Sequence, residues 1–132
     1  MDKENFFIGQ FPKNPFNGDD GAVIGEWVYS QDAFFEGVHF KREWMSLEEI
    51  GYKAMMVNIS DAIVMNAVPK YALITAALPS SMSPEEMKGL AKGLAKGAKK
   101  YGITIVGGDT ISNVKLDLSV TIVSHVTTPI YR

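Results

Sequence analysis

The sequence contains no cysteine among its 132 residues, which excludes both a disulfide framework and a thiolate metal site. It also lacks a strong excess of either charge. Its 13 Lys and Arg stand against 15 Asp and Glu, which gives no general attraction to nucleic acid or to a membrane surface. No apolar run reaches the ~20 residues that a transmembrane helix requires. We therefore expect neither a nucleic acid nor a membrane as a partner.

The N-terminus also lacks the pattern of a signal peptide. MDKENFF is acidic and contains no basic region leading into an apolar stretch. We therefore expect a cytoplasmic protein. A hydrophobic content of 46% over this length is enough to build the core of one domain.

Turn-forming residues dominate the beginning of the chain, and residues 1–20 are expected to form a loop or arm. We expect one folded domain over residues 21–128, and residues 129–132 to begin a linker to a second domain. The turn chemistry and hydrophobic periodicity predict two or three short strands in 22–40, a helix over 46–66, a strand over 70–79, a helix over 84–101, a strand from 103 that ends at a glycine turn, and a last strand over 115–126.

Two capping boxes mark the helix starts, Ser46 with Glu49 and Ser83 with Glu86, and Gly102 suits the end of the second helix. This order of elements predicts an α+β fold. The sheet should be mixed and mainly antiparallel, with the two main helices on one face.

The second helix carries a short repeat, GLAKGLAKGAKK, in which glycines and lysines each recur every four residues. Each glycine costs about 1 kcal/mol relative to alanine inside a helix, so the repeat requires a reason. Close packing against a sheet or a partner helix is one interpretation. A basic edge that faces a phosphate is the other.

An acidic residue stands in the middle of the first predicted helix. Asp61 lies three residues after Asn58, at the margin of an apolar face predicted to contain Met55, Met56, Ile59, Ala62 and Ile63. A buried carboxylate without a partner is unfavourable by several kcal/mol, on the order estimated for buried ions. A metal or phosphate ligand explains Asp61 and Asn58 better than a solvated edge does.

Three further aspartates stand where strands are predicted to begin or end. Asp20 precedes the first strand, Asp32 lies at the end of a strand, and Asp109 follows a strand and the pair Gly107–Gly108. Glycines at such a position allow the backbone to approach a ligand closely. Taken singly, each aspartate also has an ordinary explanation as a turn or capping residue.

Taken together with Asp61, these carboxylates predict a site for hard divalent cations. Clustered carboxylates repel one another unless cations neutralise them, and oxygen ligands suit Mg²⁺ rather than zinc. Metal ions that bridge phosphates are the main device of phosphoryl transfer. His39, in EGVHF, is a second polar candidate, since a histidine donates a hydrogen bond to a phosphate or a heteroaromatic substrate near neutral pH.

The motifs GDDGAV, SQD, EGVHF, GYKAMMVNISDAIVMNAVP and IVGGDT occur here in this order. In this order they resemble the N-terminal domain of the thiamine-monophosphate kinase family. That family shares a superfamily with aminoimidazole ribonucleotide synthetase, selenophosphate synthetase and the hydrogenase maturation protein HypE. The resemblance covers roughly residues 17–126.

The resemblance implies ATP-dependent phosphorylation of thiamine monophosphate to thiamine diphosphate, assisted by Mg²⁺, in a homodimer whose two sheets close into a barrel across a two-fold axis. By motif, the implied magnesium ligands are Asp20, Asp32, Asp61, Asp109 and Ser30. His39 is the implied contact to thiamine monophosphate. The implied nucleotide contacts are Gln31, Lys53, Asn58, Gly107 and Gly108.

The chain departs from the family pattern at three positions. Gly21 stands where another residue is common, Gln31 replaces a threonine, and Asn66 replaces a glycine in a turn, although Asn tolerates left-handed backbone. The resemblance also implies a second, C-terminal domain, so we expect this chain to be a fragment of a longer protein. Two alternatives remain open: another ATP-dependent synthetase or kinase of the superfamily, and a non-catalytic domain that dimerises and binds cations.

Overall fold

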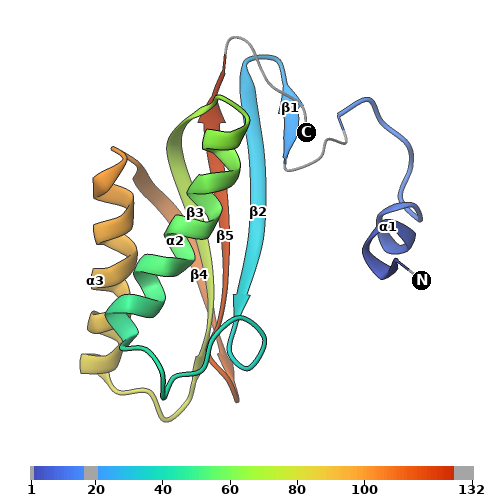
Figure 1. The fold of residues 1–132 in the computed structure, drawn as a ribbon. Coiled ribbons are helices and arrows are strands. Elements are labelled where there is room, and N and C mark those ends of the chain that lie inside the picture. The colour runs from blue at the N-terminus through green and yellow to red at the C-terminus, as the bar shows by residue number, and fades with distance from the viewer. Residues whose placement is uncertain (1, 17–20, 127–132) are drawn as a thin grey trace.

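Two helices cover one face of a five-stranded sheet in the computed structural model, which describes residues 2–16 and 21–126 (Figure 1). The predicted α+β class and the mixed, mainly antiparallel sheet are confirmed. The elements in chain order are α1 Lys3–Ile8, β1 Ala22–Ile24, β2 Trp27–Phe35, α2 Leu47–Val64, β3 Val68–Pro79, α3 Pro84–Lys100, β4 Thr104–Asn113 and β5 Asp117–His125.

The strands follow the order β1-β2-β5-β3-β4 across the sheet. Only β3 and β4 are parallel, and α3 provides the crossover between them. Helix α2 lies against β2 and β5, whereas α3 lies against β4, so the two helices share one face (Figure 1). The opposite face of the sheet carries no helix among the described residues.

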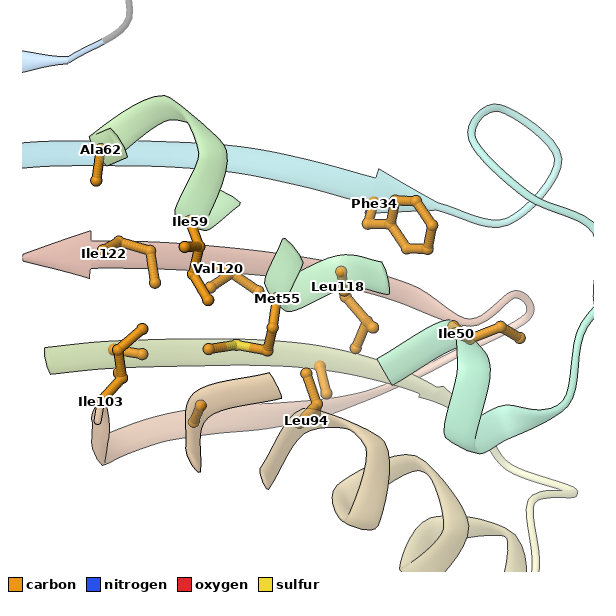
Figure 2. Close-up of a cluster of buried hydrophobic side chains, with 14 of the residues drawn as sticks. Phe34, Ile50, Met55, Ile59, Ala62, Leu94, Ile103, Leu118, Val120 and Ile122 are labelled. Carbon is orange, nitrogen blue, oxygen red and sulfur yellow. The ribbon is translucent and has the colours of Figure 1, made fainter. Parts of the chain in front are cut away.

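The core lies between α2, α3 and the sheet. Figure 2 shows Ile59 of α2 over Val120 and Ile122 of β5, with Met55 beside them. Strand β5 alternates buried with half-buried residues, the pattern of a strand with one packed face. The predicted apolar face of α2 is correct for Met55, Ile59 and Ala62. It is wrong for Ile63, which is 50% exposed, and Asn58 is buried instead.

Both predicted capping boxes are present. Ser46 and Ser83 accept hydrogen bonds from the backbone N–H groups of Glu49 and Glu86, and each glutamate accepts one in return. The predicted helix end at Gly102 is also confirmed, with a φ of 68°. Asn66 has a φ of 59°, so the turn after α2 keeps its left-handed geometry without glycine.

Local expectations also differed from the structure at the N-terminus and in β4. Residues Lys3–Ile8 form a short helix capped by Asp2, where a loop was expected; the Asp2 side chain accepts from the Asn5 backbone N–H. Strand β4 does not end at Gly107–Gly108 but continues to Asn113. A side chain at position 108 would collide with the Ile74 backbone, so glycine there lets β4 stay paired with β3.

The charge of Glu86 is expected to stabilise the fold in a pH-dependent way. The hydrogen bond from the Ser83 backbone is the main cause that lowers the pKa of Glu86 below its ordinary value of 4.5, with smaller contributions from the Ser83 hydroxyl and Arg42. A lowered pKa in the folded state gives stability that is present above 4.5 and is lost as the pH falls through the lowered value.

We therefore expect the stability difference between the wild type and Glu86→Gln to be largest near neutral pH and to shrink as the pH falls below 4.5. Chemical denaturation at a series of pH values measures it. The control is Glu85→Gln, whose carboxylate contacts Lys88 rather than the helix start. A Glu86→Gln difference that is constant with pH would contradict the expectation.

Candidate functional site

Four of the predicted site residues belong to α2 and β2, two elements that pack against each other. Ser30 and Asp32 are two residues apart on β2, so their side chains share the face that the helices cover. They stand directly opposite Ile122 and Val120 of β5, and these are the residues under Ile59 (Figure 2).

On α2, Asn58 comes one residue before Ile59 and Asp61 comes two residues after it. At about 100° per residue they lie on the side of α2 away from α3 and toward β2. We call Ser30, Asp32, Asn58 and Asp61 the α2–β2 site.

Asp32 is the exposed member of a row of side chains on the helix-covered face of β2. Its neighbours on the same face of β2, Ser30 and Phe34, are buried, whereas Asp32 is exposed. Asp61 is half-buried and Asn58 is fully buried. The site therefore combines two buried polar side chains, Ser30 and Asn58, with the exposed carboxylate of Asp32.

Two buried oxygens at this site have no hydrogen-bond partner among the described residues. The Asn58 amide nitrogen donates to the Ala54 carbonyl at 2.8 Å, but its Oδ1 accepts nothing, and the Ser30 hydroxyl is also unpaired. An unmade bond to a buried polar group is unfavourable by about 1–3 kcal/mol. Unpaired oxygens beside two carboxylates form an all-oxygen donor set, which fits a hard cation such as Mg²⁺.

The other predicted metal ligands are not part of this group. Asp109 lies on β4, three strand spacings from Asp32, which places their Cα atoms roughly 14 Å apart. Asp20 lies outside the described residues. Within the described part of the chain, no three His, Asp or Glu side chains are close enough to hold one metal ion. Asp32 and Asp109 also stand inside their strands, not at the strand ends where they were expected.

The predicted nucleotide contacts are spread over separate surfaces. Gln31 lies on the uncovered sheet face, where it bonds Ser119 at 3.3 Å and Thr121 at 3.0 Å. Gly107 and Gly108 lie on the edge strand β4. Lys53 is exposed on the outer side of α2, so of this set only Asn58 reaches the α2–β2 site.

His39 is held in one orientation by its neighbours. Its ring stacks on Phe34 at 5.9 Å and meets the edge of Phe35 at 6.3 Å, while its Nδ1 accepts the Phe35 backbone N–H at 2.8 Å. Because Nδ1 uses its lone pair in that bond, neutral His39 carries its proton on Nε2. His39 therefore presents an N–H donor in the loop that follows β2. His125, by contrast, contacts Glu26 and Trp27 within the sheet.

One buried hydroxyl was not singled out from the sequence. Ser124 is fully buried and has no hydrogen-bond partner among the residues that the structure describes. It occupies the inward-facing register of β5 that otherwise holds Leu118, Val120 and Ile122. The signal that identifies Ser124 in the sequence is a polar residue at a position where the alternation of β5 predicts an apolar one. Ser124 lies opposite Val28, one row beyond Ser30, and serves below as a control.

Comparison with known proteins decides the family. Residues 18–126 match the model described as AIR synthase related protein, N-terminal domain. The chain belongs to this family. It is 38% identical to the thiamine-monophosphate kinase of Bacillus subtilis over 115 residues, which is 83% of this chain and 35% of that protein. The kinase of Pyrococcus horikoshii is also 38% identical, over 79% of this chain and 34% of that protein.

Solved structures agree with this assignment. Thiamine monophosphate kinase from Aquifex aeolicus superposes on 84% of this chain with a TM-score of 0.80 and 30% identity. AaThiL complexed with AMPPCP and TMP superposes on 97% with a TM-score of 0.90 and 28% identity. The hydrogenase maturation protein HypE of E. coli, 22% identical with a TM-score of 0.65, shares the fold.

The similarity covers only part of the length of each kinase. This chain spans 35% of the Bacillus subtilis kinase and 42% of AaThiL. None of the described helices is both long and apolar enough to cross a membrane.

Proposed function

We propose that this chain is the nucleotide- and magnesium-binding N-terminal part of a thiamine-monophosphate kinase, which uses ATP to convert thiamine monophosphate to thiamine diphosphate in the cytoplasm. The observation that carries the proposal is the 38% identity to such kinases, together with the unpaired oxygens of the α2–β2 site. The relative complexed with AMPPCP and TMP supports the same pair of ligands. The proposed domain spans residues 21–128, after an arm of residues 1–20.

In the proposed reaction a phosphate oxygen of thiamine monophosphate attacks the γ-phosphorus of ATP. The bond from that phosphorus to the β–γ bridging oxygen breaks, and ADP leaves with that electron pair. Bound Mg²⁺ would neutralise the phosphate oxygens.

The chain's own residues would orient the reactants. Asp32 and Asp61 would hold the cation, and Ser30 and Asn58 would supply neutral oxygens from their buried side chains. His39 would donate a hydrogen bond from its Nε2–H group to the substrate, and the fixed tautomer favours that bond.

A second copy of the chain is part of the proposal. The uncovered sheet face exposes large apolar side chains from three strands, among them Tyr29 at 40%, Tyr71 at 44% and Leu73 at 43%. Such a face is typical of an interaction surface rather than of a solvated one. We propose that two sheets meet there and close into a barrel. Because Asp109 is roughly 14 Å from Asp32 of its own chain, Asp109 and Gly107–Gly108 would join the site only by serving the partner copy.

A product assay tests this function. The protein translated from the complete reading frame that contains this sequence, supplied with ATP, Mg²⁺ and thiamine monophosphate, is expected to form thiamine diphosphate and ADP in equal amounts. Chromatography of both products measures it. Turnover of aminoimidazole ribonucleotide precursors or selenide instead would assign the chain to another branch of the superfamily, and no turnover of any of them would favour a non-catalytic domain.

Two serine variants separate a ligand role from a structural one. Ser30→Ala and Ser124→Ala each remove an unpaired buried hydroxyl, so both are expected to leave stability unchanged or raise it by about 1 kcal/mol. Only Ser30→Ala is expected to weaken binding of Mg²⁺ and a non-hydrolysable ATP analogue, measured by calorimetric titration. Equal binding by both variants would remove Ser30 from the site.

A further inference from the structure

A hollow of about 430 Å³ lies on the outer surface of the two helices, on the side away from the sheet. This volume lies within the roughly 300–1,000 Å³ of small-molecule sites. The hollow plays no part in the function proposed above. Its lining residues are Met45, Glu48, Glu49, Tyr52, Lys53, Met56 and Lys96.

The ring of Tyr52 forms one wall and is flanked by ammonium groups from α3. The Lys96 Nζ lies 5.8 Å from the ring centroid and the Lys100 Nζ lies 6.0 Å from it. Lys100 also donates to the Tyr52 hydroxyl at 3.2 Å, and this bond raises the pKa of Lys100. An aromatic surface and positive charge therefore occur side by side.

Glycines in the helix interface bring these groups together. A side chain at Gly93 would collide with the Glu48 carbonyl and lie 2.9 Å from the Tyr52 backbone nitrogen; one at Gly97 would lie 2.7 Å from the Met55 Cβ. The close approach of α3 is what lets Lys96 and Lys100 reach Tyr52 on α2.

The lining of the hollow carries two glutamates and two lysines, which are equal in formal charge. Among the described residues, Lys53 and Lys96 form no ion pair. Of the two acids, Glu49 accepts the Ser46 backbone N–H at 2.9 Å, a bond that lowers its pKa and directs its carboxylate to the positive end of α2. The excess positive charge at the hollow therefore comes from Lys100, whose ammonium group lies against Tyr52.

We propose that this hollow is a second binding site, which takes a small aromatic phosphate monoester. The aromatic ring of the ligand packs against Tyr52 and the two methionines, and the phosphate meets Lys53 and Lys96. The site is separate from the α2–β2 site, because Tyr52 and Asp61 are nine residues apart and project from opposite flanks of α2, about 180° apart.

Phenyl phosphate is the probe that tests the site. Titrated into the ¹⁵N-labelled 132-residue chain, it should give saturable amide shifts at Tyr52, Lys53, Met56 and Lys96. Its affinity should exceed those of inorganic phosphate and of benzyl alcohol by about 10-fold, since each of these offers only half of the contacts. Equal affinity for phenyl phosphate and inorganic phosphate would overturn the proposal.

Matched lysine variants locate the binding. Lys96→Gln should weaken phenyl phosphate binding by about 10-fold, the loss of one charge-assisted contact. Lys92→Gln, one turn earlier on α3 and outside the hollow, should leave it unchanged. Equal losses in the two variants would indicate general attraction to a basic helix and would overturn the site.

The test also distinguishes this site from the proposed nucleotide site. Asp32→Asn should leave the phenyl phosphate affinity unchanged, whatever it does to nucleotide binding. Binding of an acidic tyrosine-containing peptide at these amides without binding of phenyl phosphate would assign the hollow to a peptide and overturn the proposal.

Discussion

Replacing Gly93 with alanine is expected to lower the free energy of unfolding by about 1–3 kcal/mol, as overpacked substitutions do. The added Cβ would collide with the Glu48 carbonyl and press on the Tyr52 backbone nitrogen. Backbone atoms cannot rotate away, so α2 and α3 must separate. This loss should outweigh the gain of about 1 kcal/mol that alanine brings in helix propensity. Chemical denaturation with a constant m-value measures the change.

Gly89 provides the matched control in the same helix. A Cβ there meets only the Leu47 Cβ, at 3.7 Å, an ordinary contact. Gly89→Ala is therefore expected to raise stability by up to about 1 kcal/mol through helix propensity. If both variants changed stability in the same direction, the close contact at Gly93 would not be what holds the two helices together.

Replacing Asp61 with asparagine is expected to weaken magnesium-dependent nucleotide binding by at least about 10–100-fold, because even outer partners of metal ligands have effects of that size. Asparagine keeps the size of the side chain but removes the charge that a cation requires. Calorimetric titration of a non-hydrolysable ATP analogue, with and without Mg²⁺, measures the effect. The difference should vanish when Mg²⁺ is omitted.

Two controls accompany the Asp61 variant. Glu43→Gln removes the same charge from an exposed loop position outside the α2–β2 site and should leave binding unchanged. Thermal unfolding without ligand shows whether Asp61→Asn still folds. Unchanged Mg²⁺-dependent binding in a folded Asp61→Asn would exclude the role given to this residue, and the α2–β2 site with it.

The helices and their ends could be predicted because their causes are local. The capping boxes at Ser46 and Ser83 involve residues three positions apart, and the stop at Gly102 depends on one φ angle. The class of the sheet followed from element order. The two misplaced ends, at Asp32 and Asp109, have a common reason: a strand continues as long as its neighbour pairs with it, and the neighbour is distant in sequence.

The candidate site was predicted in residue type but not in arrangement. The motif positions named Ser30, Gln31 and Asp32 together, yet strand alternation sends Gln31 to the uncovered face. Likewise Lys53 and Asn58 share a helix but lie about 140° apart around it. Adjacency in sequence does not imply adjacency in space, and only the register of β2 under α2 selects which members of a motif meet.

The sequence by itself determined the family, the main helices and strands, and the all-oxygen chemistry of the candidate ligands, and it left two interpretations of the glycine repeat in α3 open. The tertiary structure decided which partners those features have. Gly93 packs against α2, α2 packs against β2, and two strands separate Asp32 on β2 from Asp109 on β4. The tertiary structure also created the hollow at Tyr52. These outcomes depend on the strand order and on the distance between the two helices. Both arise from contacts between segments far apart in the chain, so no local sequence pattern predicts them.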